Sequence, residues 1–419
     1  MFFSKLHYLY SSSKLLRASG TLFIGGTFAG ILGYGFQVVM GRLLQPQEYG
    51  LFNAVMSLFV IFSAPLGTLM LLVTRKVSAY RTQGEMGSIR HLFYSLNLKI
   101  VGAGILLFGA FYFFAPDIQG YLKSPNLIVV YLFGLLIFLN FPMSVNNAFL
   151  QGKQRFIWYA ITTNLSVLIK LALATTFVLL GYGVEGAIGG VAGSFIALWL
   201  ISYGVMRPFL EKARLAPFKS SHFSIGGIFP VLIANLTFAI MTQMDMVLVN
   251  YFFSSKESGL YASASVLGKA VMYLSGGIVI ALFPLVVEKH TLKEKNSHLL
   301  VQAVGLTLAL CGFGALFYFF FGEQIIALLY GQDYQRAGVV LKFYGLIMIP
   351  MALILVAENY LIATGKVLFA YLFLALIPFQ LAAIYFYHDS LLQVITVMGL
   401  FGCIQAIIGY VLLWKAFQK

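Results

Sequence analysis

The sequence has few charged residues and almost no cysteine. Only 10% of its 419 residues are Asp, Glu, Lys or Arg, whereas soluble domains carry about 25%. Hydrophobic residues make up 60% of the chain, and the mean hydropathy is +0.91. A soluble globule of this composition would expose a mostly apolar surface, so we expect a chain whose solvent is lipid. The composition excludes a cytosolic enzyme, a secreted disulfide scaffold and a disordered tail.

Several chemical motifs are also missing. The two cysteines, Cys311 and Cys403, lie inside apolar runs, which argues against a disulfide or a metal site. The sequence contains no G-x-x-x-x-G-K-[ST] phosphate loop, no H-E-x-x-H and no Cys/His cluster. These absences disfavour an ATP-driven pump and a metalloenzyme. We therefore predict a secondary transporter with no cofactor, no metal and no catalytic residues.

What the sequence has instead is long apolar runs. A helix needs about 20 apolar residues to cross the bilayer core. Twelve runs meet this length, at residues 18–41, 50–73, 93–115, 126–149, 156–181, 185–206, 224–251, 259–286, 298–321, 337–363, 367–387 and 391–414. The runs predict an all-α integral membrane protein with twelve transmembrane helices.

The net charge of +14 is distributed along the chain in a way that supports this count. With the N-terminus in the cytoplasm, the cytoplasmic segments collect twenty of the 27 Lys and Arg residues. The outer side holds Arg42, Lys123, Lys256 and Arg336. One span more or fewer would destroy this segregation, so we expect both termini in the cytoplasm. The basic residues are spread over many short segments, which argues against a nucleic-acid partner.

The two halves of the chain resemble each other. Glu48-Tyr49-Gly50-Leu51-Phe52 follows the first span, and Glu257-Ser258-Gly259-Leu260-Tyr261 follows the seventh, 209 residues later. Pro142 in the fourth span and Pro350 in the tenth both precede a Gly-Lys pair. A parallel repeat of two six-helix halves is typical of transporters that rock two bundles about a central site. We predict an N-terminal lobe over 1–207, a cytoplasmic linker over 208–223 and a C-terminal lobe over 224–419.

Polar residues inside the spans are the candidates for function. A charge at the centre of a membrane helix costs about 2.5–3.5 kcal/mol even on the lenient insertion scale. Lys170 and Lys269 lie near mid-span, and for them we favour a water-filled cavity over a buried ion pair. Asp245 could nevertheless pair with Lys269 across adjacent helices. Small and hydroxyl residues on the same faces also fit plain helix packing. An electropositive, polar cavity suits an anionic solute that also carries hydroxyl groups.

The segment Met40–Phe52, its echo Ser258-Gly259-Leu260-Tyr261 and the turn Leu329–Tyr334 resemble bacterial polysaccharide transporters. These are Wzx-type O-antigen and exopolysaccharide flippases, in the superfamily that also holds multidrug/toxin extruders and the lipid II flippase. The resemblance covers the whole chain. It implies a V-shaped exporter fold of two lobes in the bacterial inner membrane, with a cationic cavity lined by spans 1, 2, 7 and 8.

The resemblance also implies a substrate, which is an oligosaccharide linked to polyprenyl pyrophosphate and flipped outward through the membrane lipid. A polysaccharide polymerase and chain-length proteins are the partners it implies. On this hypothesis Lys269 and Arg75 attract the phosphates. The other substrate-binding candidates are polar side chains of the spans, with Gln37, Asn53 and Asn235 bonding sugar hydroxyls and Lys170 and Asn147 contributing further contacts. Asp245 and Glu358 are candidates for binding a coupling ion.

Two alternatives stay open from the sequence. A cation-coupled drug exporter of the same superfamily would favour intramembrane acids near the inner leaflet, where only Glu358 lies. A membrane polysaccharide polymerase or ligase would act on the same lipid-linked sugars. Such enzymes usually carry a large outer loop with catalytic residues, and no outer loop here is long.

Overall fold

A computed structural model of the chain describes residues 14–211, 229–292, 294 and 297–417. The described residues are almost entirely helical, in agreement with the all-α prediction. Clustering of contacts divides the chain into two compact units. Unit 1 comprises Met1–Leu43 and Pro65–Phe223, and unit 2 comprises Leu44–Ala64 and Ser224–Lys419.

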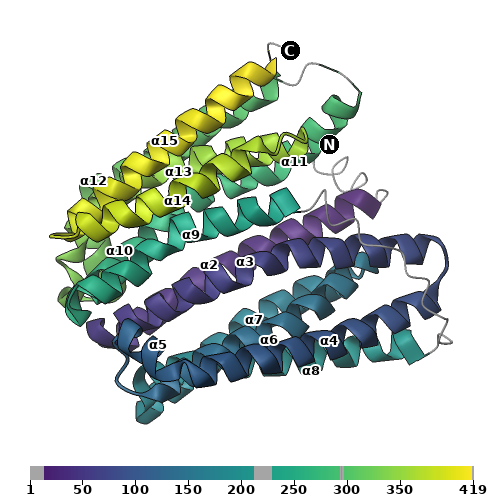
Figure 1. Cartoon of the computed structure of the whole chain (residues 1–419), viewed down its shortest axis with the longest axis horizontal. Helices are drawn as coiled ribbons and strands as arrows, with labels where there is room; N and C mark the ends of the chain where they lie inside the picture. The colour runs from purple at the N-terminus through teal and green to yellow at the C-terminus, as the bar shows by residue number, and fades with distance from the viewer. Residues whose placement is uncertain (1–13, 212–228, 293, 295–296, 418–419) are drawn as a thin grey trace, which may run out of the picture. The chain divides into compact units, whose positions relative to one another are not determined.

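Unit 1 is a bundle of long helices (Figure 1). Its helices are α2 (Lys14–Leu43), the second part of α3 (Pro46–Thr82), α4 (Met86–Phe113), α5 (Ala115–Leu122), α6 (Leu127–Gly152), α7 (Phe156–Phe177) and α8 (Gly183–Glu211). The main helix pairs are α2 with α7, α4 with α6, and α8 with both α6 and α7. A buried apolar cluster that includes Val77, Phe93 and Phe149 joins α3, α4 and α6.

Unit 2 is built around α13. Its helices are the first part of α3, α9 (Phe229–Phe252), α10 (Ser255–Leu274), α11 (Gly276–Thr291), α12 (Ser297–Tyr330), α13 (Ala337–Ala363), α14 (Leu368–Phe386) and α15 (Leu391–Phe417). α13 packs against α10, α11, α12 and α15. Figure 1 shows α9, α10 and α12–α15 running side by side.

One helix, α3, is divided between the two units. The first part of α3 clusters with unit 2 and the second part with unit 1, and the boundary falls between Ala64 and Pro65. Proline lacks a backbone N–H and disturbs the hydrogen-bond ladder of a helix, so α3 is locally weakened at this point. Most of the predicted linker 208–223 lies outside the described residues.

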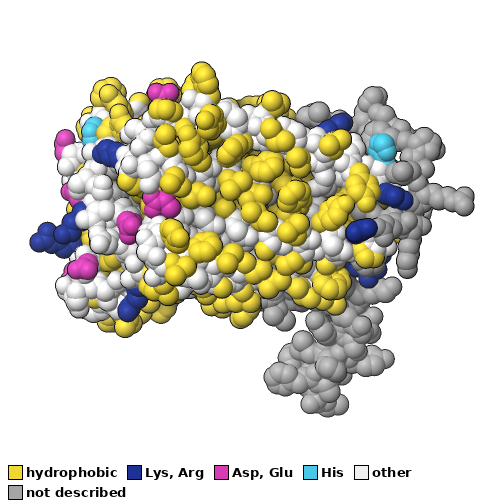
Figure 2. Space-filling model, turned by 90° about the horizontal axis from the view of Figure 1, so that it is seen from below, with side chains coloured by type: hydrophobic (Ala, Val, Ile, Leu, Met, Phe, Trp, Pro, Cys, Tyr) yellow, Lys and Arg dark blue, Asp and Glu magenta, His cyan; other side chains and the backbone are white. Residues whose placement is uncertain are grey.

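The helices carry a large outward-facing apolar surface. Side chains such as Leu106, Phe113, Phe313 and Leu328 are more than two-thirds exposed. Figure 2 shows a broad yellow zone in the middle of one face, with Asp and Glu gathered toward one end and Lys and Arg at both ends. Apolar patches of this extent are rare on soluble monomers and mark a membrane-facing surface. In the part of the chain that the structure describes, ten helical stretches are long and apolar enough to cross a membrane. One of them covers both α7 and α8 and another covers both α10 and α11, and α2 is not among the ten.

The helices match the twelve predicted spans, with two differences of detail. The eighth span, predicted over 259–286, is two helices, because α10 ends at Leu274 and α11 begins at Gly276. Between α7 and α8 lies a π-helical turn, η1 (Val178–Tyr182), that contains Gly181 at φ 91°. A positive φ of this size is accessible to glycine at little cost, so Gly181 lets the chain turn from α7 into α8 within a few residues.

The two matching motifs of the predicted repeat, at Glu48–Phe52 and Glu257–Tyr261, meet inside unit 2. In both, a glutamate in the first helical turn accepts a hydrogen bond from the backbone N–H before the helix, Gln45 to Glu48 and Ser254 to Glu257, each at 3.2 Å. A Cβ on Gly50 would lie 2.7 Å from the backbone nitrogen of Gly259. The backbones at the start of α3 and the start of α10 are therefore in direct contact at Gly50 and Gly259.

Candidate functional site

The candidate site lies inside unit 2 and starts from one face of α10. Tyr261, Ser265 and Lys269 follow one another at intervals of four residues, so they lie above one another on that face. Long side chains on a helix point back toward its N-terminus, which carries the Lys269 ammonium toward the turn that holds Ser265. Gly268, next to Lys269, leaves room for the ring of Tyr344 from α13, since a Cβ there would lie 3.1 Å from the ring's Cγ.

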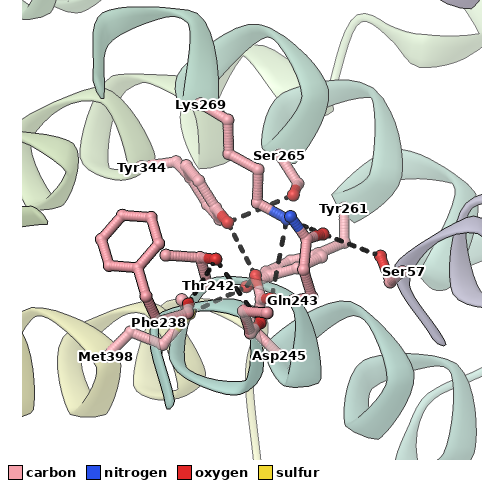
Figure 3. A network of polar contacts seen from close by, with 11 residues as sticks. Ser57, Phe238, Thr242, Gln243, Asp245, Tyr261, Ser265, Lys269, Tyr344 and Met398 are labelled. Atoms are coloured by element: carbon pink, nitrogen blue, oxygen red, sulfur yellow. Dashed lines mark hydrogen bonds and ion pairs between the residues drawn. The ribbon is translucent and has the colours of Figure 1, made fainter. Parts of the chain in front are cut away.

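Lys269 is buried, with 7% of its surface exposed. Its Nζ donates a hydrogen bond to Gln243 Oε1 of α9 at 3.1 Å and lies 3.8 Å from Asp245 Oδ1. Figure 3 shows the Gln243 side-chain oxygen between the Lys269 ammonium and the Ser57 hydroxyl. The same Gln243 oxygen accepts a hydrogen bond from Ser57 Oγ at 3.2 Å, so α3 also contributes to the site.

Asp245 is held by two tyrosines. Its Oδ2 accepts hydrogen bonds from Tyr261 OH at 2.9 Å and Tyr344 OH at 2.7 Å, and only 1% of the residue is exposed. Ser265 Oγ in turn donates to Tyr344 OH at 3.1 Å. The other carboxylate oxygen, Oδ1, is buried and has no hydrogen-bond partner. At 3.8 Å the Lys269 ammonium attracts Oδ1 electrostatically but is too far away to donate a hydrogen bond to it.

Lys269 thus lies in the buried ion pair that was the second alternative from the sequence, and not in the water-filled surroundings that we favoured. The physical reason is that Asp245 and Gln243 lie two residues apart on α9, within reach of the flexible lysine stem. Burying two charges costs several kcal/mol each, and the pair recovers this only with good geometry and further hydrogen bonds. Here Asp245 Oδ1 has no hydrogen-bond donor, and Lys269 donates one hydrogen bond, to Gln243. Both charged groups can therefore form further hydrogen bonds to another molecule.

Three other candidates of unit 2 lie outside this network. Asn53 is buried and donates to the backbone oxygen of Tyr49 in its own helix at 2.9 Å. Asn235 lies two turns before Thr242 on α9 and is half-buried. Glu358 on α13 is 4% exposed and has neither a hydrogen-bond nor an ion-pair partner among the described residues.

Lys170 of α7 is the corresponding mid-span cation of unit 1. Its Nζ lies over the ring of Phe36 from α2, 4.4 Å from the centroid, which is a favourable cation–π geometry. Among the residues that the structure describes, no carboxylate comes within ion-pair distance of this lysine. Gln37, the residue after Phe36, has a buried Oε1 without a hydrogen-bond partner. Unit 1 therefore holds a half-buried cation with no described counter-charge.

The remaining two candidates of unit 1 have different surroundings. Asn147 of α6 is half-buried, and its Oδ1 accepts a hydrogen bond from Thr162 Oγ1 of α7 at 3.2 Å. Arg75 in the second part of α3 is exposed. Among the predicted site residues, Lys269 and Asp245 are the pair for which the structure shows a direct contact.

Sequence reasoning missed three members of the network. Gln243, Tyr261 and Tyr344 all bond directly to Lys269 or Asp245. Tyr261 could have been found, because it precedes Ser265 and Lys269 by one and two helical repeats on the same face. Tyr344 carries no such signal, since it comes from a helix far along the chain. Within the described part of the chain, no three His, Cys, Asp or Glu residues are grouped closely enough to hold a metal ion.

Known proteins resemble this chain mainly in structure. The inward-facing conformation of a multidrug resistance MATE family transporter of the MOP superfamily superposes with a TM-score of 0.76 at 14% identity, covering 93% of this chain and 94% of that chain. The lipid II flippase MurJ, in an inward closed conformation, gives a TM-score of 0.71 at 16% identity, covering 95% and 87%. A MOP superfamily transporter from Pyrococcus furiosus, described as having a binding pocket of reverse polarity, gives 0.68 at 14% identity, covering 96% and 95%.

At these identities the structural matches establish the fold, which is that of the MOP superfamily transporters. Among curated proteins, none matches the sequence significantly. The family model described as "Polysaccharide biosynthesis protein" matches residues 39–339, which is more than half of the chain. The match includes the Gly50 and Gly259 motifs, Asp245, Lys269 and Lys170. The chain is therefore a multi-pass helical membrane protein that belongs to the polysaccharide biosynthesis protein family.

Proposed function

We propose that the chain is a flippase that moves oligosaccharide units linked to polyprenyl pyrophosphate from the cytoplasmic to the outer leaflet of the bacterial inner membrane. The two six-helix halves would open alternately to the two sides, and the polyprenyl tail would stay in lipid. The units would then serve surface polysaccharide synthesis. Family membership supports the pathway, and the structural similarity to MurJ, which is described as a lipid II flippase, supports a lipid-linked substrate.

The observation that carries the proposal is the partly satisfied ammonium of Lys269. An ammonium has three donors, and Lys269 uses one on Gln243 while standing 3.8 Å from Asp245. A pyrophosphate oxygen offers a stronger, charge-assisted acceptor than the Gln243 amide. An incoming pyrophosphate can therefore compete with Asp245 for this cation when the bundle opens.

Displacement of Lys269 would leave Asp245 as a buried carboxylate held only by Tyr261 and Tyr344. A buried carboxylate without a counter-charge tends to take up a proton or a cation. Asp245 would thus bind the coupling ion as the substrate binds Lys269. This exchange gives a physical reason for charge in a membrane interior, which is otherwise costly.

The other candidate residues take supporting roles in this proposal. Arg75 is exposed and Lys170 has no described carboxylate partner, so both can attract phosphate. Gln37, Asn53, Asn147 and Asn235 supply amide groups for sugar hydroxyls. The excess of Lys and Arg on alternate connecting segments supports the cytoplasmic placement of both termini.

One observation favours a second candidate function, a cation-coupled drug exporter. Glu358 is a buried carboxyl near the predicted cytoplasmic end of α13, with no partner among the described residues. Such a group suits proton exchange with a cationic drug. The basic side chains Lys269 and Lys170 are less suited to that role, because they would repel a cation.

Depletion of the protein from its host separates the two functions. For the flippase we expect lipid-linked oligosaccharide to accumulate in the inner leaflet and surface polysaccharide to fall, with unchanged drug sensitivity. Mass spectrometry of extracted lipids and surface-glycan staining measure the first two, and minimal inhibitory concentrations of cationic drugs measure the third. Raised drug sensitivity with normal glycan would contradict the flippase and support the drug exporter.

A further inference from the structure

Unit 1 contains a pocket that the network in unit 2 does not use. The pocket lies between α2, α6 and α7, and its volume is about 250 Å³. It is lined by Gly25, Gly26, Gln151, Tyr159, Ala160 and Thr163. Pockets for drug-sized ligands measure about 300–1,000 Å³. This one is smaller, so it fits a single ring and not a whole oligosaccharide.

The polar wall of the pocket is held in place by the rest of unit 1. Gln151 Oε1 accepts a hydrogen bond from Thr74 Oγ1 of α3 at 3.2 Å, which orients the amide. The next residue, Gly152, fits tightly against α3, because a Cβ there would lie 2.8 Å from the backbone oxygen of Thr74. Tyr159 is half-buried and packs against the apolar cluster of Val77 and Phe149. Contacts within unit 1 thus hold the polar wall in place.

The pocket offers hydrogen bonds but no charge. With its oxygen bonded to Thr74, the Gln151 side chain keeps its Nε2 group, which has no partner within the described part of the chain. Tyr159 adds a phenol ring, and Thr163 adds a hydroxyl oxygen that can accept a hydrogen bond while its hydrogen is donated to the backbone oxygen of Tyr159 at 2.8 Å. None of the lining side chains is an acid or a base. An amide, a hydroxyl and an aromatic ring around a small space suit a neutral, hydroxyl-rich ring such as a sugar.

Positive charge gathers just outside the pocket. Lys153 follows Gln151 by two residues, beyond the end of α6. Burial and the positive charges of Arg155 and Arg81 lower the pKa of the Lys153 amine below its usual value. These three cations are thus close enough to repel one another. They would attract a pyrophosphate to the cytoplasmic ends of α6 and α7, one or two turns from the pocket.

We propose that this pocket is a subsite for one neutral sugar ring of the lipid-linked substrate, namely the ring next to the pyrophosphate. The inference rests on the proposed flippase function and adds a recognition site on unit 1. The cations at the ends of α6 and α7 hold the pyrophosphate, and the pocket holds the first sugar. The site thus distinguishes polyprenyl pyrophosphate that carries a sugar from polyprenyl pyrophosphate without one, at the cytoplasmic side.

Two glycines of α2 provide a matched pair of variants. Gly26 lines the pocket, and no atom lies within 4 Å of the position of an added Cβ. Gly26→Leu therefore adds a side chain at the pocket wall whose Cβ meets no other atom. Gly35 also faces open space but does not line the pocket. It lies nine residues on, which at 100° per residue is the opposite face of α2. Gly35→Leu is the control, and Gln151→Ala removes the free amide.

The experiment measures binding to the full chain in lipid nanodiscs. The probes are undecaprenyl pyrophosphate alone and the same lipid carrying one hexose or one N-acetylhexosamine. Microscale thermophoresis measures the affinity of the protein for each probe. We expect the wild type and Gly35→Leu to bind at least one glycosylated probe more tightly than the bare lipid. The margin is about two- to tenfold, as set by one or two neutral hydrogen bonds. Gly26→Leu and Gln151→Ala should lose this margin and keep the affinity for the bare lipid.

Each other outcome overturns the inference. If the margin persists in Gly26→Leu, the sugar is bound elsewhere. If the wild type binds the bare lipid but shows no margin for any sugar, the pocket does not recognise the ring. If Gly26→Leu weakens the bare lipid as much as the glycosylated one, the pocket is not specific for sugar. If the wild type binds none of the probes, the proposed flippase function fails as well, which distinguishes that failure from the first three.

Discussion

At the scale of single residues, the Lys269–Asp245 pair places two buried charges in unit 2. Removing one partner of a buried ion pair costs about 3–5 kcal/mol because it leaves the other charge uncompensated. Replacing both partners by neutral residues is often close to neutral for stability. Both side chains are almost completely buried here, so this pair should follow the same rule. Stability alone would therefore not require the pair.

This reasoning predicts the stability of three variants. Lys269→Met leaves Asp245 buried with only its tyrosine donors, and Asp245→Asn leaves the Lys269 ammonium with only Gln243. Each single variant should lose about 3–5 kcal/mol of unfolding free energy. The double variant Lys269→Met/Asp245→Asn should recover most of that loss. Thermal unfolding of the purified protein in detergent measures all three.

A surface ion pair provides the control for this cycle. Lys342 Nζ bonds Glu323 Oε1 at 2.7 Å, and both side chains are partly exposed. Exposed pairs contribute about 0–1 kcal/mol, so Lys342→Met should change stability little. A double variant of the buried pair that is as unstable as the sum of its singles would show that the two charges do not act on each other.

At the scale of elements, the crossing of α3 and α10 depends on Gly259. A Cβ on this residue would collide with the backbone of Pro46, and backbone cannot move aside as a side chain can. Overpacking of this kind costs about 1–3 kcal/mol. The repeat motif therefore has a packing role, because the glycine of each half lets the two helix starts approach each other.

Gly259→Ala should accordingly destabilise unit 2 by about 1–3 kcal/mol and lower the yield of folded protein. Size-exclusion chromatography in detergent and thermal unfolding would measure both. The matched control is Gly276→Ala at the start of α11, where an added Cβ meets nothing within 4 Å. An alanine at this helical position is expected to be neutral or slightly stabilising. Equal stability of Gly259→Ala and wild type would contradict the close crossing.

The helices could be predicted from the sequence because a helix that crosses the bilayer core needs a run of about 20 apolar residues, and such runs are visible in the sequence. The break at Ser275 inside the eighth span could not, since apolar residues continue on both sides of it. In the site, Lys269 and Asp245 were visible as charges in apolar runs. Tyr344 and Gln243 were not, because their partners depend on which helix faces come together.

At the scale of the whole molecule, the chain combines an apolar exterior with a few buried charges in each unit. Unit 2 holds the Lys269 network, and unit 1 holds Lys170 and the small polar pocket. Charges within membrane spans are costly and usually mark a pathway for substrate or ions. The chain has the fold of MOP superfamily transporters and belongs to a polysaccharide biosynthesis family. The transport of an anionic glycolipid that we propose would give these charges a function.

The measurement that tests this account most directly is leaflet transfer in proteoliposomes. Lipid-linked oligosaccharide from depleted cells would be reconstituted into liposomes with wild type or with the folded double variant Lys269→Met/Asp245→Asn. A glycosidase that cannot cross the membrane then measures the fraction of the oligosaccharide that lies in the outer leaflet. The account predicts that wild type makes the oligosaccharide of the inner leaflet accessible to the glycosidase with time, and that with the double variant this oligosaccharide stays inaccessible. A double variant that transfers the lipid as fast as wild type would contradict the role of the buried pair, and a wild type that transfers none would contradict the flippase.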